Sequence, residues 1–171
     1  AKKIDFKPAE NGAYPYGNLL LASNGKMYGL TSYLDPSHKG ALFEYDYVTN
    51  VITKKIDFGG TPDNGYFPTG DLIEAPNGKL YGLTSKGGAS DMGTIFEYDP
   101  ATANYALKFS FNGNADGGFP HGSLSLSSNC KLYGMTSGEE TTNLGTLFEY
   151  NYDDTIKVTV NFNGDNGQNP Y

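Results

Sequence analysis

The stretch Lys79-Leu80-Tyr81-Gly82-Leu83-Thr84-Ser85, followed by Gly93-Thr94-Ile95-Phe96-Glu97-Tyr98, decides the fold of this chain. The same pattern occurs twice more, at residues 26–32 with 40–45 and at residues 131–137 with 145–150. Self-similarity at a period of about fifty residues is typical of propellers, solenoids and other arrays. We therefore divide the 171 residues into repeat units and not into conventional domains.

Proline and phenylalanine markers recur in a constant phase along the chain. Their spacing predicts three complete repeats of about 52 residues, 14–66, 67–118 and 119–168. Residues 1–13 then correspond to the last strand and loop of a preceding repeat, and residues 169–171 to the start of a following one. The markers are Pro15, Pro68, Pro120 and Pro170 at one end of the unit, and Phe6, Phe58, Phe111 and Phe162 at the other.

Each repeat contains four strand-like runs separated by turn residues, which in the second repeat are 71–75, 79–85, 94–99 and 104–111. Between the first two runs, Asn77-Gly78 favours a two-residue hairpin turn in which both residues have positive φ. The third repeat has Cys130 in place of the glycine. We expect Cys130 to adopt the left-handed conformation at a cost of ~1 kcal/mol.

Four antiparallel strands per unit, without helical periodicity, predict an all-β fold built from propeller-type blades. Closed propellers have roughly four to eight blades, so three blades form an open-ended part of a larger ring or array. Adjacent repeats or further copies of the chain would complete it. The run Lys2-Lys3-Ile4-Asp5-Phe6 reads as a surplus strand, which predicts a strand-addition interface with a neighbouring edge.

Composition and charge exclude several classes of partner. The net charge of -7, without any cluster of Lys or Arg, argues against nucleic acid, because phosphate neutralisation needs a basic face. No apolar run is long enough to span a membrane, and no signal peptide precedes Ala1, so we expect a mature piece or an excerpt. A single cysteine excludes an internal disulfide and supports no redox role.

The carboxylates do not form a recognisable catalytic or metal site. Glu44, Glu97 and Glu149 fall one per blade, so we expect each to accept hydrogen bonds from the backbone or from hydroxyl groups of the adjacent strand, for example Thr or Ser of the Leu-Thr-Ser run. Residues 112–117 resemble the start of a calcium loop, but Ser123 stands where the bidentate glutamate belongs, which favours a simple Asx-rich turn. We therefore predict no catalytic residue, no cofactor and no metal.

Aromatic and polar residues of the loops are the better binding candidates, because tyrosine and asparagine offer stacking surfaces and hydrogen bonds to sugars or proteins. The plainer interpretation is that tyrosine is simply the preferred strand residue of this repeat. The histidines are expected to be solvent-facing loop residues, since no zinc or triad motif includes them. The candidate ligand or partner surface consists of Tyr33, Asp35, His38, Tyr66, Asp91, His121 and Asn143.

Nearly the whole chain resembles the GloVer tandem repeat, a propeller-type repeat of mostly bacterial exported proteins. The resemblance is carried by Pro-x-Gly-x-Leu, Asn-Gly-Lys-Leu-Tyr-Gly-Leu-Thr-Ser, Gly-Gly, Gly-Thr-Ile-Phe-Glu-Tyr, Phe and Asp-Gly-Gly-Phe-Pro, and it is best in the second repeat. There Gly87-Gly88 is kept, whereas the first repeat has Leu34-Asp35. The resemblance implies export and surface display, and it brings no catalytic residues with it.

The leading hypothesis is a non-enzymatic structural or adhesive repeat protein, extracellular or at the cell surface, that self-associates through repeat edges, for example into a surface fibre. The alternative is a lectin-like propeller module that binds polysaccharide. A glycoside hydrolase is the third hypothesis, and it would need Glu97 in a cleft with a partner carboxylate roughly 5 to 10 Å away.

Overall fold

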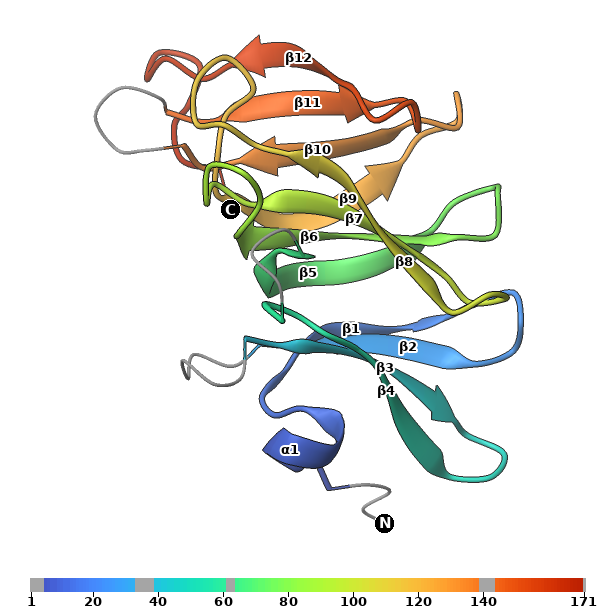
Figure 1. Cartoon of the computed structure of the whole chain (residues 1–171). Coiled ribbons are helices and arrows are strands. Elements are labelled where there is room, and N and C mark those ends of the chain that lie inside the picture. The colour runs from blue at the N-terminus through green and yellow to red at the C-terminus, as the bar shows by residue number, and fades with distance from the viewer. Residues whose placement is uncertain (1–4, 33–38, 61–63, 139–143, 171) are drawn as a thin grey trace.

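The computed structural model describes residues 5–32, 39–60, 64–138 and 144–170, and within these it contains three four-stranded antiparallel sheets. We call them blade 1 (β1–β4), blade 2 (β5–β8) and blade 3 (β9–β12). The blades lie one on another in chain order (Figure 1). Their strands are β1 Pro15–Leu21, β2 Met27–Thr31, β3 Ala41–Asp46, β4 Val51–Asp57, β5 Tyr66–Glu74, β6 Leu80–Lys86, β7 Thr94–Asp99, β8 Asn104–Ser110, β9 Pro120–Leu126, β10 Leu132–Thr136, β11 Thr146–Tyr150 and β12 Ile156–Asn161.

The all-β, open-ended blade architecture expected from the repeats is confirmed. Every blade has the strand order first-second-third-fourth, with each strand paired to the next in sequence. The first strand is longer than expected in blade 2, where it begins at Tyr66 and not at Asp71. The strand pairs with β6 up to Thr69 and again from Ile73, and the register shifts between these two residues.

The hairpin between the first and second strands differs from the expected two-residue turn. Gly25 and Gly78 have φ of 77° and 76°, but the preceding asparagines do not have positive φ. The Gly25 N–H donates to the Ala22 carbonyl, and the Ala22 N–H to the Lys26 carbonyl. This is a three-residue loop that ends on a left-handed residue. Cys130 takes that position in blade 3 with φ 63°, so its expected left-handed conformation is confirmed.

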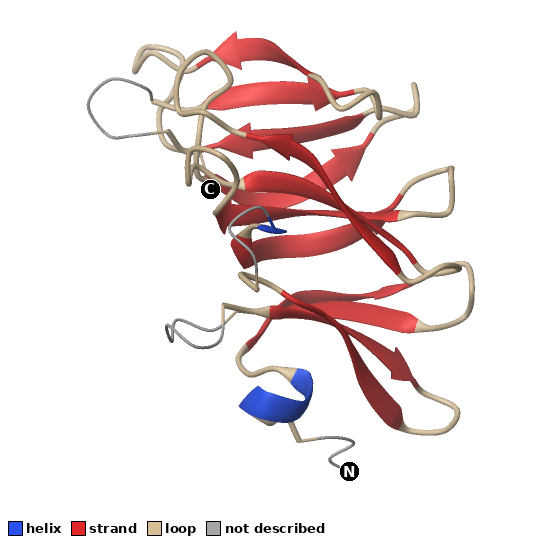
Figure 2. Cartoon of the chain, in the orientation of Figure 1, coloured by secondary structure: helices blue, strands red, loops and turns tan. Residues whose placement is uncertain are grey.

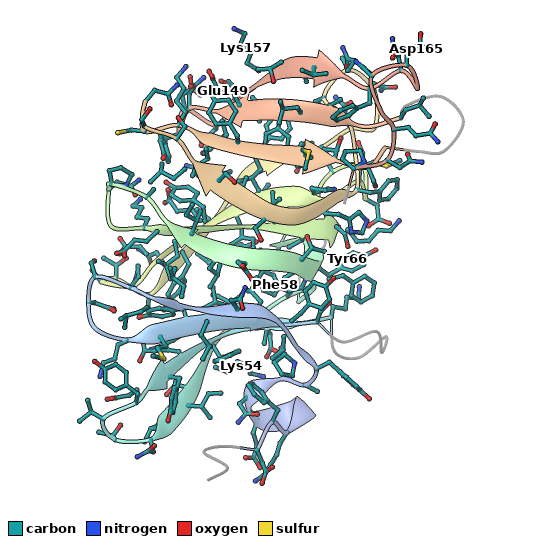
Figure 3. All side chains as sticks on the ribbon, turned by 180° about the vertical axis from the view of Figure 1, so that it is seen from behind. Lys54, Phe58, Tyr66, Glu149, Lys157 and Asp165 are labelled. Atoms are coloured by element: carbon teal, nitrogen blue, oxygen red, sulfur yellow. The ribbon has the colours of Figure 1, made fainter. Side chains whose placement is uncertain are left out.

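The core lies between the blades, because each sheet is apolar on both faces. One cluster joins blade 1 to blade 2 around Tyr28, Leu30 and Phe96, and a second joins blade 2 to blade 3 around Tyr81 and Phe148. Phe58, at the end of blade 1, packs against Phe96 of blade 2 with ring centroids 5.1 Å apart. Figure 3 shows Phe58 between the two sheets. Blade stacking is therefore what buries the apolar side chains of each repeat.

Of the expected N-terminal strand, the structure describes Asp5 and Phe6, which lie outside any strand. They are followed by a single helical turn, α1 Pro8–Asn11, which Figure 2 shows beside blade 1. The turn is closed by the Asn11 side chain, which accepts from the Lys7 N–H at 2.7 Å and donates to the Asp5 carbonyl. Proline at the first helical position favours this local closure. Lys2, Lys3 and Ile4 lie outside the described residues.

Candidate functional site

Blade 1 has an apolar outer face that the repeat elsewhere keeps covered. Leu19 corresponds in the repeat to Leu72 and Leu124, which are 5% and 4% exposed at the blade interfaces, yet Leu19 itself is 52% exposed. A cavity of about 280 Å³ lies on this face. Its lining includes Phe6, Tyr16, Leu19, Phe43, Tyr45 and Ile52.

Blade 3 has the complementary outer face. Tyr133 and Leu147 correspond to Tyr28 and Leu42 of blade 1, both of which are fully buried against blade 2. On blade 3 the same positions are only partly buried, and so are Met135 and Val160 on the same face. The two outer faces therefore carry the two halves of the interface that the chain forms twice internally.

The first strands of the three blades, β1, β5 and β9, approach one another closely because each has a glycine at the same position. These glycines are Gly17, Gly70 and Gly122. A Cβ on Gly17 would lie 2.6 Å from the Gly70 carbonyl oxygen, which is closer than van der Waals contact allows. Polar contacts follow beside the glycines. The Asn18 N–H and side-chain amide donate to the Asp71 carboxylate at 2.5 and 3.0 Å. These contacts fix how one blade sits on the next.

Two short segments outside the blades repeat contacts of the internal linkers. Phe6 packs on Phe43 with centroids 5.2 Å apart, as Phe111 packs on Phe148 at 5.2 Å. At the other end, the Asn169 N–H donates to the Leu144 carbonyl at 2.7 Å, and the corresponding Phe119 N–H donates to the Met92 carbonyl at 2.7 Å. Each outer face therefore already carries a few residues where a neighbouring blade would end or begin.

The recurring glutamates form hydrogen-bonded groups with tyrosine and lysine at the hairpin end of each blade. Glu149 accepts from the Tyr133 hydroxyl and from Lys131 Nζ, both at 2.5 Å. Glu97 does the same with Tyr81 at 2.5 Å and Lys79 at 2.6 Å. Hydroxyl donors from the adjacent strand were expected, but they come from tyrosine and not from the Thr and Ser of the same run.

Blade 1 varies this arrangement. Glu44 accepts from Tyr28 at 2.7 Å, but its lysine is Lys55 of β4, at 3.1 Å. Lys26, which corresponds to Lys79 of blade 2, instead pairs with Asp46 at 2.5 Å. The hydrogen bond from Lys26, followed by that from the Val48 N–H, holds the pKa of Asp46 well below its usual range. In all three blades the glutamate is occupied by its own sheet.

The electrostatics fit a structural role for these groups. The hydrogen bonds from Lys131 and then Tyr133 lower the pKa of Glu149, and the bond to Glu149 raises the pKa of Lys131. Burial, followed by the hydrogen bond to Glu97, raises the pKa of the Tyr81 hydroxyl above its ordinary value. A carboxylate with a lowered pKa, held by a lysine, is a poor general acid. Glu97, the residue of the hydrolase hypothesis, is likewise held by Lys79 and Tyr81, so its contacts give that hypothesis no support.

Tyr66 and Asp91, two of the predicted surface residues, lie together at the opposite end of the blades, as the labels of Tyr66 and Glu149 show in Figure 3. The Tyr66 hydroxyl donates to Asp91 at 2.7 Å, which, with burial, raises the pKa of Tyr66 to about 12. The Asp91 carboxylate also accepts from the Gly87 N–H at 2.9 Å. Lys39 Nζ lies 4.3 Å from the Tyr66 ring centroid.

His121 lines a second cavity, also of about 280 Å³, at the junction of blades 2 and 3. It is partly buried, and burial lowers its pKa, so the expectation of a solvent-facing loop residue is wrong for His121. The other lining residues were not predicted from the sequence. They are Phe67, Ser85, Lys86, Phe119, Ser137, Gly138 and Asn169.

Tyr33, Asp35, His38 and Asn143 lie outside the described residues. The loop at residues 112–117 is closed by its own side chains, since the Asn114 N–H donates to Asn112 and the Asn112 N–H to Asp116. Within the described parts of the chain, no group of three or more His, Cys, Asp or Glu side chains could hold a metal ion. None of the described helices has the length and apolar character to cross a membrane.

Comparison with known proteins identifies the repeat. The family model described as the Gloeobacter/Verrucomicrobia repeat matches residues 3–171. No protein with curated annotation matches the chain. Among solved structures, the fold is similar to that of the extracellular domain of a hybrid two-component system from B. thetaiotaomicron, with a TM-score of 0.52 and 14% identity. That match covers 88% of this chain and 16% of the other.

Proposed function

The chain belongs to the Gloeobacter/Verrucomicrobia repeat family, and we propose that it is a non-enzymatic, extracellular structural module whose two outer blade faces associate with each other between copies. The observation that carries the proposal is the different exposure of equivalent residues. Leu72 and Leu124 are covered by a neighbouring blade, whereas Leu19 is not. Burial of one leucine side chain stabilises an interface by about 1.5–3 kcal/mol.

The direction of the contact follows from the repeat. The outer face of blade 3 corresponds to the faces of blades 1 and 2 that receive a following blade, and the outer face of blade 1 corresponds to those that receive a preceding one. A head-to-tail contact would therefore place Leu147 and Tyr133 of one copy against Leu19 and Tyr45 of the next. Such a heterologous contact produces a ring where the rotation closes and a filament where it does not.

Polar residues along β1, β5 and β9 are also compatible with a head-to-tail contact between copies. Asp71 accepts from the Asn18 amide across the first interface, and its N–H donates to the Ser123 hydroxyl at 2.8 Å across the second. A head-to-tail contact would bring Ser123 opposite Asn18 of the next copy, and both side chains can donate and accept. Gly122 would meet Gly17, which keeps the close approach of the strands free of a Cβ.

Residues near both ends of the chain already occupy part of each outer face. Phe6 already lies on Phe43, and Pro170 already lies against Gly145, where a Cβ would be 2.8 Å from Pro170 Cδ. In a head-to-tail contact these short segments would compete with the corresponding residues of the partner. We therefore expect association between separate copies to be weaker than stacking within the chain. The module's place on the cell exterior rests on the exported character of the GloVer-type repeat.

Sedimentation equilibrium tests the proposal. The wild-type chain is expected to associate with increasing concentration, and Leu19→Glu is expected to stay near the monomer mass of 18.4 kDa. Leu21→Glu is the matched control, because blade 2 itself has Glu74 at that position. A wild-type chain that remains monomeric up to about 1 mM, where a contact worth about −4 kcal/mol would be half formed, contradicts the proposal.

A further inference from the structure

The cavity at the junction of blades 2 and 3 is not used by blade stacking. It lies where β5 and β9 begin and where β6 and β10 end, the end of the blades that also carries Tyr66. Phe67 and Phe119 contribute aromatic rings, whereas Ser85 and Ser137 contribute hydroxyl groups. Its volume of about 280 Å³ is near the lower limit of ligand pockets, roughly 300 Å³, which suits a single small ring.

Two departures from the repeat leave this space open. Gly138 stands where blade 2 has Lys86, so no side chain extends from the end of β10. Asn169 stands where the preceding units have Tyr14, Phe67 and Phe119, and it keeps their backbone conformation with φ 45° against 53°, 53° and 52°. A smaller polar side chain therefore occupies an aromatic position on an unchanged backbone.

The lining contains hydrogen-bond acceptors whose capacity is not used. The Asn169 Oδ1 atom is buried and has no hydrogen-bond partner. The Ser85 hydroxyl donates to the Phe67 carbonyl at 3.2 Å and the Ser137 hydroxyl to the Phe119 carbonyl at 3.0 Å. With their single protons committed, the hydroxyl oxygens of these two lining residues can act toward a ligand only as acceptors. A buried acceptor without a donor costs about 1–3 kcal/mol, so a ligand that supplies donors gains that energy.

The charged groups around the cavity are balanced. Lys86 Nζ lies 4.3 Å from the centroid of the Phe119 ring, an arrangement that leaves N–H groups available as donors. Asp91 is close enough to Lys86 for the lysine to contribute to the lowered pKa of that carboxyl. Its carboxylate is already held by Tyr66 and Gly87. A neutral ligand that both donates and accepts therefore fits better than an anion, because Asp91 already offsets the charge of Lys86.

We propose that this cavity binds one neutral sugar ring, with hydroxyl groups donating to Asn169 and the two serines and with one oxygen accepting from Lys86. Aromatic rings next to a few convergent polar groups are the usual composition of such sites. The binding would occur at the loop end of the blades, next to the Asn169–Pro170 segment with which a following copy would compete. It adds a glycan-recognition function to the structural module in its monomeric form.

An NMR titration of the ¹⁵N-labelled chain tests the site, with methyl glycosides of glucose, galactose, mannose and N-acetylglucosamine as neutral probes and glucuronate as the acidic probe. At least one neutral glycoside is expected to shift the amide signals of Lys86, His121, Ser137 and Gly138 in a saturable way. Glucuronate is expected to bind less tightly. An absence of saturable shifts at these residues with every neutral probe up to about 100 mM, or tighter binding of glucuronate, overturns the proposal.

Three variants connect the shifts to the cavity. Asn169→Phe restores the residue type of the other repeats, so it should keep the fold while it fills the cavity and abolishes binding. Lys86→Met keeps the side-chain stem and is expected to weaken binding about tenfold, the effect of one hydrogen bond to a charged donor. Tyr14→Asn, the same change in reverse at the equivalent position of blade 1, should leave binding unchanged. Undiminished binding by Asn169→Phe would rule out the cavity as the site.

Discussion

Glu149 shows how a recurring residue obtains its role from its neighbours. The carboxylate lies on β11 opposite Tyr133 of β10, and the lysine two residues before that tyrosine reaches the same group. The Asn129 side chain donates to the Tyr133 hydroxyl at 3.3 Å, which links the hairpin turn to the group. Buried polar groups that satisfy one another in this way fix the register of adjacent strands.

Removing the charge of Glu149 should make the free energy of unfolding less dependent on pH in the acidic range. The folded chain holds the pKa of Glu149 below the usual 4.5, so the carboxylate stabilises the fold above that pH and loses its effect as the pH falls through the lowered value. Glu149→Gln should therefore lower the free energy of unfolding in urea at pH 7 and converge with wild type near pH 2.

The control for this measurement is Asp165→Asn, at the exposed residue labelled in Figure 3. It should unfold like wild type at both pH values. An equal loss of stability for Glu149→Gln at pH 7 and pH 2 would mean that the charge of the carboxylate does not contribute.

Individual residues were predictable from the sequence where the backbone determines them. Cys130 replaces a turn glycine, so its left-handed conformation follows from the repeat alone. The hydroxyl partner of Glu149 was not predictable in the same way. Thr136, of the Thr-Ser pair expected to supply it, instead shares a hydrogen bond with Thr146 at 2.9 Å. Strand register decides which hydroxyl faces a carboxylate, and the repeat pattern does not specify register.

At the scale of the elements, the same apolar blade face is buried inside the stack and exposed at its end. The first strand carries a leucine toward the preceding blade in every repeat, at Leu19, Leu72 and Leu124. Within the chain this leucine enters an interface twice, and on blade 1 it borders a cavity. The position of the blade in the stack, and not its sequence, determines whether the face is covered.

The same substitution at two equivalent positions measures this difference. Leu72→Ala should lower the free energy of unfolding by about 2–5 kcal/mol, the usual cost of deleting a buried leucine side chain. Leu19→Ala should change it by less than ~1 kcal/mol in dilute solution, because most of the side chain already contacts water. Urea unfolding at low protein concentration compares them, and equal losses would show that the outer face of blade 1 is covered within the chain.

Strands were easier to predict than their surroundings. The periods that define β6 and β7 are visible in the sequence because apolar and turn residues recur in phase. The helical turn at Pro8–Asn11 begins with a proline where the equivalent loop of the second repeat has Gly113, although Asn11 and Asp116 close the two segments with equivalent hydrogen bonds. The expected strand over Lys2–Phe6 rested on the repeat register, in which Phe6 corresponds to the phenylalanine after the last strand of each blade. It stays a prediction, because Lys2, Lys3 and Ile4 lie outside the described residues.

For the whole molecule, the stack has two different ends and no closed ring within the described residues. Figure 1 shows the N-terminal segment beside blade 1 and the last residues returning toward the junction of blades 2 and 3. The incompleteness of three blades was predictable, because propellers require more. The cavity at the loop ends was not, since it depends on two departures, Gly138 and Asn169, whose consequence appears only when both lie at one junction.

Mixing two variants tests most directly that the outer faces are complementary halves of one interface. Leu19→Glu disables the face of blade 1, and Leu147→Glu disables that of blade 3, with Met135→Glu as a second choice if Leu147→Glu lowers the melting temperature. In sedimentation velocity, each variant alone should remain a monomer, whereas their mixture should form a one-to-one dimer through the two intact faces. Self-association of either variant alone, or a mixture that stays monomeric while wild type associates, would contradict a head-to-tail contact.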